Sequence, residues 1–244
     1  MIRLTNLTKD FGTTVAVKNL NLHVATGEIY GFIGPNGAGK TTTIRMMAGV
    51  IAPTSGKVVI GGFDLAQNPV AAKSIIGFVP DRPFLYEKLT GMEFLRFISD
   101  LYSVPQNTFT AKAKDVLQQF ALWNWADELI EAYSHGMKQR LIIASALLHD
   151  PKVLIIDEPM VGLDPQAVHM VKNILKSLAA QNISIFVSTH TLSIAEDLCD
   201  RIGLIHRGSL LAEGTLDDLK KIARLDKARL EEVFLTLIQE NIFI

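Results

Sequence analysis

The sequence predicts an α/β protein with a mainly parallel sheet, an antiparallel β-subdomain at the N-terminus and an inserted α-helical subdomain. Short apolar runs that alternate with helical patterns predict the parallel sheet. The opening segment alternates apolar with polar residues instead, which is typical of antiparallel strands. Residues 82–133 hold helical patterns and no convincing strand, so the helical subdomain is expected there.

The first elements are strands. Residues 2–4, 15–17 and 20–24 have the alternating pattern, and we expect them to form the antiparallel sheet. The apolar run at residues 28–33 then ends in a glycine-rich loop, and residues 41–50 carry apolar side chains at helical spacing. This order of strand, loop and helix predicts the first unit of the parallel sheet.

The middle of the chain is predicted to be helical. Thr90 and Glu93 have the spacing of a capping box, which marks the start of a helix. Trp123 and Trp125 lie further along the same segment. We expect these large aromatic side chains in the core or at a contact with another subunit.

The second half returns to alternating elements. Residues 153–156 and 183–187 are β-branched runs of the buried-strand type, and residues 165–180 between them have a helical period. From residue 216 onward, basic and apolar residues alternate in a pattern that predicts an amphipathic helix with a solvated face. A local patch for nucleic acid is the alternative interpretation of these basic residues.

Composition excludes several classes of protein. The 24 basic and 25 acidic side chains leave a formal net charge of −1, so no global field attracts nucleic acid or an anionic membrane surface. One cysteine, Cys199, excludes an internal disulfide and fits a reducing compartment. The mean hydropathy of +0.25 is high, but the longest apolar runs are much shorter than the about 20 residues of a membrane-spanning helix. A well-buried sheet and an apolar face for a partner would explain the hydropathy.

The glycine-rich loop has the sequence GPNGAGKT and fits the phosphate-loop pattern G-x-x-x-x-G-K-S/T between a predicted strand and a predicted helix. Its backbone N–H groups would surround phosphate oxygens, with Lys40 reaching the β- and γ-phosphates and Thr41 ligating Mg²⁺. A chance match is the alternative, which the strand and helix on either side disfavour. The candidate nucleotide-binding residues here are Gly34, Asn36, Gly37, Gly39, Lys40, Thr41 and Thr42.

Two acids, Asp157 and Glu158, follow the apolar run at residues 153–156. Ligands of α/β sheets bind at the carboxyl ends of the strands, so these acids are expected at the site. Asp157 would hold the Mg²⁺ shell, and Glu158 would act as the general base for the attacking water. A solvated turn is the alternative interpretation of the pair.

Together these motifs resemble the ATP-binding subunits of ABC transporters over nearly the whole chain, which implies a P-loop NTPase core. The family signature is similar to YSHGMKQR at residues 133–140, and the D-loop to VGLD at residues 161–164. The resemblance implies that Ser134 and Gly136 contact the γ-phosphate of a nucleotide on another subunit, and that Asp164 borders the same site. It further implies that His190 is the switch histidine and that Phe11 stacks on adenine.

The resemblance also implies an organisation and partners. The chain would be one ABC ATPase domain, with a core from residues 1–81 and 140–215, a helical and signature part at 82–139, and a C-terminal helical tail at 216–244. ATP with Mg²⁺ would join two subunits head to tail, as a homodimer or as a heterodimer with a related ATPase. The dimer would drive an integral-membrane permease from the cytoplasmic face of the membrane, with no nucleic acid as partner.

Three positions depart from the family pattern. Asp81 stands where the Q-loop glutamine is expected, and it could approach the Mg²⁺ shell or sense the partner. His135 and Met137 replace the usual glycine and glutamine of the signature. These features resemble the ABC-2 branch, which implies an exporter. Two further function classes stay open: a soluble ABC ATPase acting on ribosomes or nucleic acid, and a nucleotide switch without hydrolysis, which the presence of Glu158 and His190 disfavours.

Overall fold

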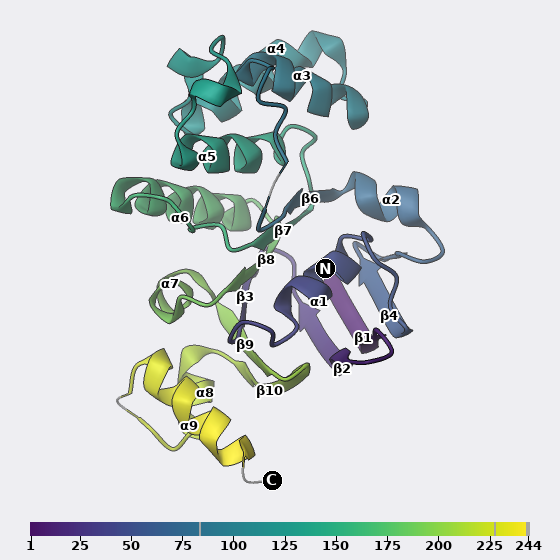
Figure 1. The fold of residues 1–244 in the computed structure, drawn as a ribbon, viewed down its shortest axis with the longest axis vertical. Coiled ribbons are helices and arrows are strands. Elements are labelled where there is room, and N and C mark those ends of the chain that lie inside the picture. The colour runs from purple at the N-terminus through teal and green to yellow at the C-terminus, as the bar shows by residue number, and fades with distance from the viewer. Residues whose placement is uncertain (83, 227, 243–244) are drawn as a thin grey trace.

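The computed structural model describes residues 1–82, 84–226 and 228–242. Residues 243 and 244, the end of the predicted tail at 216–244, lie outside the described part, as do residues 83 and 227. Figure 1 shows three regions: a helical region at the top, a central sheet with a smaller sheet beside it, and two C-terminal helices at the bottom.

The central sheet has six strands in the order β10-β9-β3-β8-β7-β6. All neighbouring pairs are parallel except β9 and β10, which pair antiparallel. The mainly parallel sheet is therefore confirmed. The strands are β3 (Ile29–Ile33), β6 (Ile76–Val79), β7 (Val153–Asp157), β8 (Ser184–Thr189), β9 (Arg201–His206) and β10 (Ser209–Gly214).

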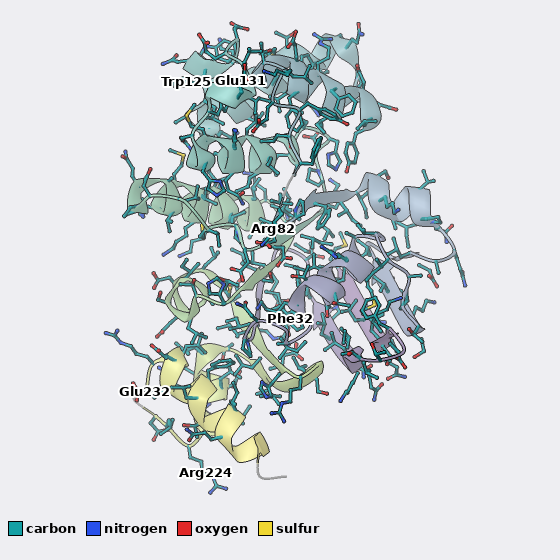
Figure 2. The ribbon with its side chains drawn as sticks, in the orientation of Figure 1. Phe32, Arg82, Trp125, Glu131, Arg224 and Glu232 are labelled. Carbon is teal, nitrogen blue, oxygen red and sulfur yellow. The ribbon has the colours of Figure 1, made fainter. Side chains whose placement is uncertain are left out.

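Burial explains why the three middle strands are so apolar. Every residue of β3, β7 and β8 is buried, because both faces of this sheet are covered, one by helices and the other by a helix and the second sheet. The ring of Phe186 in β8 packs against Tyr30 and Phe32 of β3, with ring centroids 5.6 and 5.3 Å away. Phe32 is labelled in Figure 2. The helices that follow these strands are α1 (Lys40–Met47), α6 (Pro165–Ala180) and α7 (Leu192–Leu198).

The second sheet is antiparallel, as predicted, and has the order β2-β1-β4-β5. Its apolar side chains share one core with α1 and with the central sheet. This packing places the start of β2, at Ala16 and Val17, beside the start of α1. The strands are β1 (Ile2–Asp10), β2 (Val15–Val24), β4 (Ser55–Ile60) and β5 (Phe63–Asp64), and the short helix α2 (Pro69–Ser74) follows them.

Residues 84–145 form the helical region and contain no strand among those described, apart from a single bridge between Thr90 and Leu129. The predicted capping box is confirmed: Thr90 Oγ1 accepts from the Glu93 N–H, and Glu93 accepts from the Thr90 N–H. The elements are α3 (Gly91–Leu101), α4 (Gln106–Gln119), two 3₁₀ turns (Trp123–Trp125 and Ile130–Ala132) and α5 (His135–Ser145).

The prediction that Trp123 and Trp125 lie in the core is wrong. Their side chains are 37% and 42% exposed, because the 3₁₀ turn that carries them lies on the surface. The Lys114 ammonium lies over the Trp123 ring at 5.6 Å, and Tyr133 packs edge-on against Trp125. A contact with another subunit, the second interpretation, stays a prediction.

A histidine joins the helical region to the central sheet. The ring of His149, after α5, stacks on Tyr102 at the end of α3 with a centroid distance of 3.7 Å. Its Nε2 atom lies 3.0 Å from the carbonyl oxygen of Ile76 in β6. Burial lowers the pKa of His149, so the ring is held neutral and donates this hydrogen bond.

The C-terminal part forms two helices, α8 (Leu216–Ile222) and α9 (Leu230–Ile242), where one amphipathic pattern was predicted. Their apolar side chains form a separate core with α7, β9 and β10. No described helix is long and apolar enough to cross a membrane. The strands β4, β5, β6, β9 and β10 were not predicted.

Candidate functional site

The phosphate loop connects β3 to α1 and depends on its glycines. Gly37 and Gly39 have φ angles of 79° and 109°, in the left-handed region that other residues avoid. A Cβ on Gly39 would lie 2.5 Å from the Ala16 carbonyl oxygen, so a larger residue would displace strand β2. The glycines therefore give the loop the concave backbone that a phosphate group fits.

Lys40, the first residue of α1, is buried at this loop. Its ammonium group donates hydrogen bonds to the carbonyl oxygens of Gly34 and Pro35, at 2.7 and 3.3 Å. Burial lowers the pKa of Lys40, and the nearby Glu158, Asp157 and Asp81 carboxylates raise it. A cation in this low-dielectric position attracts an anionic ligand more strongly than a solvated lysine would.

A cavity of about 380 Å³ lies above the loop and brings together residues from five segments that are far apart in sequence. Asn36, Thr41 and Thr42 line it as predicted, and so do Asp81, Glu158 and His190. The predicted Gly37, Gly39 and Lys40 also line it. Ala16 and Val161 complete the wall and were not predicted.

Asp157 lies at the end of β7 and is buried. Its Oδ1 atom accepts a hydrogen bond from the Ser188 hydroxyl, and Oδ2 is buried with no hydrogen-bond partner among the described residues. Thr41 and Asp157 border a second cavity of about 310 Å³ next to the first. A buried carboxylate oxygen and a threonine hydroxyl are hard oxygen donors, which fits Mg²⁺.

The described residues contain no cluster of three or more histidine, cysteine, aspartate or glutamate side chains that would hold a metal alone. Mg²⁺ commonly keeps several waters and shares substrate phosphates with one or two protein ligands. The donor set of Thr41 and Asp157 therefore fits a Mg²⁺ ion that arrives with a nucleotide.

Glu158 and His190 form a pair at the mouth of the larger cavity. The Nδ1 atom of His190 lies 2.8 Å from Oε1 of Glu158. Glu158 has a φ of 54°, so the chain turns sharply after β7 and directs this side chain away from the sheet. The Glu158 N–H donates to the Ser188 carbonyl at 3.1 Å, which holds the turn against β8.

The predicted signature residues lie elsewhere. Ser134 caps α5 and accepts a hydrogen bond from the Met137 N–H at 3.2 Å, so its own hydroxyl proton is available to a ligand. Neither Ser134 nor Gly136 lines the cavity at the phosphate loop. In Figure 1, α5 lies in the upper region, and α1 lies in the middle, between the central sheet and the smaller sheet.

The D-loop residues lie next to the signature of the same chain. Asp164 caps α6 and accepts from the Ala167 N–H at 2.8 Å. Gly162, with a φ of 76°, lies so close to the His135 ring that a Cβ there would collide with it. One chain thus presents a phosphate-loop cavity at one place, and a helix N-terminus beside its D-loop at another.

Comparison with known proteins decides the family. The family model described as "ABC transporter" matches residues 17–161, which is more than half of the chain. The chain belongs to this family. The bacitracin transport ATP-binding protein BcrA of Bacillus licheniformis is 43% identical to it, over 91% of the chain and 72% of BcrA. The linearmycin resistance ATP-binding protein LnrL of Bacillus subtilis is 36% identical, over 98% of the chain and 79% of LnrL.

Solved structures agree with this family and with the P-loop NTPase fold. An ATP-binding subunit of an ABC transporter has a TM-score of 0.92 and 33% identity, covering 98% of this chain and 99% of that one. A dimeric ATP-binding cassette in a post-hydrolysis state, bound to ADP and Pi, has a TM-score of 0.81 and 26% identity, covering 88% and 99%. The chain is an ABC ATPase, and these relatives favour a transporter subunit over the ribosome or nucleic-acid alternative.

Two further predicted residues of this ABC ATPase, Phe11 and Asp81, differ in how they lie relative to the cavity. Phe11, in the loop before β2, is 56% exposed and lies 5.1 Å from the Lys9 ammonium, but it does not line the cavity. Asp81 follows β6 and is exposed. It lines the two cavities described above and also a groove on the helical region. Asp81 therefore lies between the phosphate-loop cavity and the groove on the helical region.

Ser188 was not predicted as a site residue, although it lies against both Asp157 and Glu158 in this ABC ATPase. Residues 153–156 and 183–187 were predicted as strands, but their register was not. In the parallel pair β7–β8, Asp157 is the register partner of Ser188. That register is the signal that would have found the contact, since register partners on neighbouring strands point to the same face.

Proposed function

We propose that this ABC ATPase is a MgATP-hydrolysing motor subunit that pairs head to tail with a second subunit and drives a membrane permease. One observation carries the proposal: the phosphate loop, Glu158 and His190 surround one cavity, while Ser134 and Gly136 lie at a separate surface. A single nucleotide cannot reach both sets within one chain. A second subunit would bring its own Ser134 to the nucleotide held by Lys40.

In the proposed reaction, Glu158 accepts a proton from water while the water oxygen bonds to the γ-phosphorus and the bond to ADP breaks. His190, at 2.8 Å, orients the Glu158 carboxylate and reaches toward the γ-phosphate. Lys40 binds the β- and γ-phosphates through its ammonium group. Mg²⁺, held by Thr41 and through water by Asp157, would neutralise charge that develops on the phosphate oxygens.

The test of the motor is Glu158→Gln. The amide keeps the shape of the side chain but accepts no proton, so ATP turnover should fall by about a hundredfold or more. ATP binding, measured by fluorescence of a labelled nucleotide, should persist, and a dimer should accumulate with ATP in size-exclusion chromatography. Glu232→Gln on α9 is the matched control, far from the cavity (Figure 2), and should leave turnover unchanged. Turnover near the parental rate in Glu158→Gln would remove the general-base assignment.

The permease is proposed to dock in a groove of about 810 Å³ between Asp81 and the helical region. Phe84 and Tyr86 line the groove, and Phe97 continues the row, with edge-on ring pairs at 5.4 and 5.3 Å. Phe84 is 80% exposed, which is unusual for a phenylalanine without a partner. Figure 2 shows Arg82 at the junction of the core and the helical region, beside this groove.

Two exposed apolar residues make the docking test sharp. Phe84→Arg should abolish co-purification of the tagged protein with an integral-membrane partner from native membranes. Val70→Arg is the control, because Val70 is 81% exposed but lies on α2, away from the groove. Equal loss of the partner in both variants would contradict docking in this groove. Recovery of ribosomal components alone with the parental protein would favour the soluble alternative.

The proposed direction of transport is export, from the cytoplasmic face of the membrane. The names of the similar proteins BcrA and LnrL refer to bacitracin transport and linearmycin resistance. We extend this to an antimicrobial compound as cargo of the same general kind. A strain without this ATPase should be more sensitive to such a compound than the parent, and Glu158→Gln should fail to restore resistance.

A further inference from the structure

Ser188 contacts both acids of the proposed catalytic site, Asp157 and Glu158, although it is not among the predicted site residues. It is fully buried near the end of β8, in register with Asp157 of β7 on one side and Phe32 of β3 on the other. Its hydroxyl donates to Oδ1 of Asp157, and its carbonyl oxygen accepts from the Glu158 N–H at 3.1 Å. One residue therefore touches both consecutive acids, each through a different group.

The hydroxyl bond fixes the rotation of the Asp157 carboxylate. With Oδ1 engaged by Ser188, the carboxylate is held so that Oδ2 is the oxygen left without a partner among the described residues. Oδ2 is also buried, and an unpaired buried carboxylate oxygen is costly unless a cation or water reaches it. The Asp157 side chain borders the cavity that Thr41 shares.

We propose that Ser188 is a positioning residue that holds Asp157 in the orientation required by the Mg²⁺ shell of the bound nucleotide. This inference rests on the proposed MgATP function and assigns a new role within it. Mg²⁺ demands nearly octahedral geometry, so a carboxylate that rotates freely is a poorer anchor for it. Partners that orient a metal-binding group typically change metal affinity by about tenfold or more when they are lost.

The strand itself offers a matched control. Ser184, at the other end of β8, is also buried, and its hydroxyl donates to the Ala25 carbonyl at 2.8 Å. Ser184→Ala and Ser188→Ala remove the same atom from the same strand. Both should lower the melting temperature, but only Ser188→Ala disturbs the acid that faces the metal.

The experiment measures binding of a labelled, non-hydrolysable ATP analogue while Mg²⁺ is varied, so no turnover is needed. In Ser188→Ala the half-saturating Mg²⁺ concentration should rise by about tenfold. Binding in EDTA should equal that of the parental protein. Ser184→Ala should keep the parental Mg²⁺ dependence, and Ser188→Thr, which retains a hydroxyl, should recover most of it.

Ser188→Cys, which keeps the side-chain size with a weaker donor, serves if the alanine variant does not fold. A half-saturating Mg²⁺ concentration within twofold of the parental value in folded Ser188→Ala, or in Ser188→Cys where the alanine variant does not fold, would overturn the role of Ser188. Equal shifts in Ser184→Ala and Ser188→Ala would overturn it too, since a general loosening of β8 would then be the cause. A parental protein without any Mg²⁺ dependence would instead contradict the proposed function, so the two failures are distinguishable.

Discussion

The phosphate-loop cavity and the signature end of α5 differ in how much of a binding site each contains. The cavity combines a buried lysine, two carboxylates and a histidine, which follow the ends of four neighbouring strands. The signature end offers a serine hydroxyl and N–H groups at the start of a helix, and Ser134 and Gly136 do not line that cavity. The first is a site in itself, and the second is one wall of a site.

This difference follows from where each region lies in the fold. Parallel strands bring residues that are far apart in sequence to one edge of a sheet, so a complete cavity can form within one chain. The N-terminus of α5 lies in the helical region instead, where it borders the D-loop at Gly162. Substitutions should therefore separate ATP binding by a single chain from ATP-dependent assembly of the dimer.

Lys40→Ala should have the largest effect, because it removes the cation from the complete site. We expect ATP affinity to fall by more than about tenfold, since a charge-assisted contact to phosphate in a buried position contributes about 1.5–3 kcal/mol. Titration calorimetry measures this directly. Lys114→Ala, at the surface against Trp123, should bind ATP normally. Unchanged ATP affinity in Lys40→Ala would show that the phosphate-loop cavity is not the primary nucleotide site.

Ser134→Arg should have a smaller effect on binding and a selective effect on assembly. ATP affinity of the single chain should stay within about twofold, because Ser134 does not line the cavity. The ATP-dependent dimer of the Glu158→Gln protein should be lost when Ser134→Arg is added, since the bulky side chain occupies the helix N-terminus. Light scattering with and without ATP measures the dimer. A dimer that survives this substitution would show that the two regions do not face each other.

The smallest expected effect is at the junction between the two regions. Burial lowers the pKa of His149, so between the ordinary histidine pKa of about 6.5 and the lowered value the unfolded chain binds a proton that the folded chain excludes. Stability is therefore fully present above about pH 6.5 and is lost as the pH falls through this window. The groups that also act on His149 are Asp150, which raises its pKa, and Lys112, which lowers it.

Calorimetry at two pH values measures this effect. The melting temperature of the parental protein should fall between pH 7.5 and pH 5.5 by an amount on the order of 2 °C from this residue. His149→Leu cannot take up the proton and should show a smaller fall, although it is less stable at both values because it loses the bond to Ile76. The same fall in both proteins would exclude His149 as its source.

The sequence predicted the parts of the fold that local pattern determines. Strands β3, β7 and β8 are buried apolar runs, and helix α6 has a clear period, so both were recognised. Strands β6 and β9 were missed because glycines interrupt short segments, IGFV and RIGLIH, and β4 begins with the turn-like Ser-Gly-Lys. Their pairing depends on the neighbouring strands more than on their own pattern.

The same distinction between local pattern and strand pairing explains which residues of the candidate site could be predicted. Motifs such as GPNGAGKT are contiguous, so Lys40 and Thr41 could be named from spacing alone. Contacts that depend on register or on tertiary packing could not. Ser188 meets Asp157 only because β7 and β8 align in that register, and His135 meets Gly162 only because α5 lies against the D-loop.

The contact between His135 and Gly162 bears on whether the two ATP sites of a dimer act independently. Val161 lines the proposed ATP-hydrolysis cavity, and the next residue, Gly162, lies against the His135 ring. His135 adjoins Ser134, which is proposed to bind the nucleotide of the neighbouring subunit. In a head-to-tail dimer, ATP hydrolysis in one subunit's cavity would thus be transmitted through Val161, Gly162 and His135 to the contact between Ser134 and the nucleotide of the other subunit. The two ATP sites of such a dimer would therefore not hydrolyse ATP independently of each other.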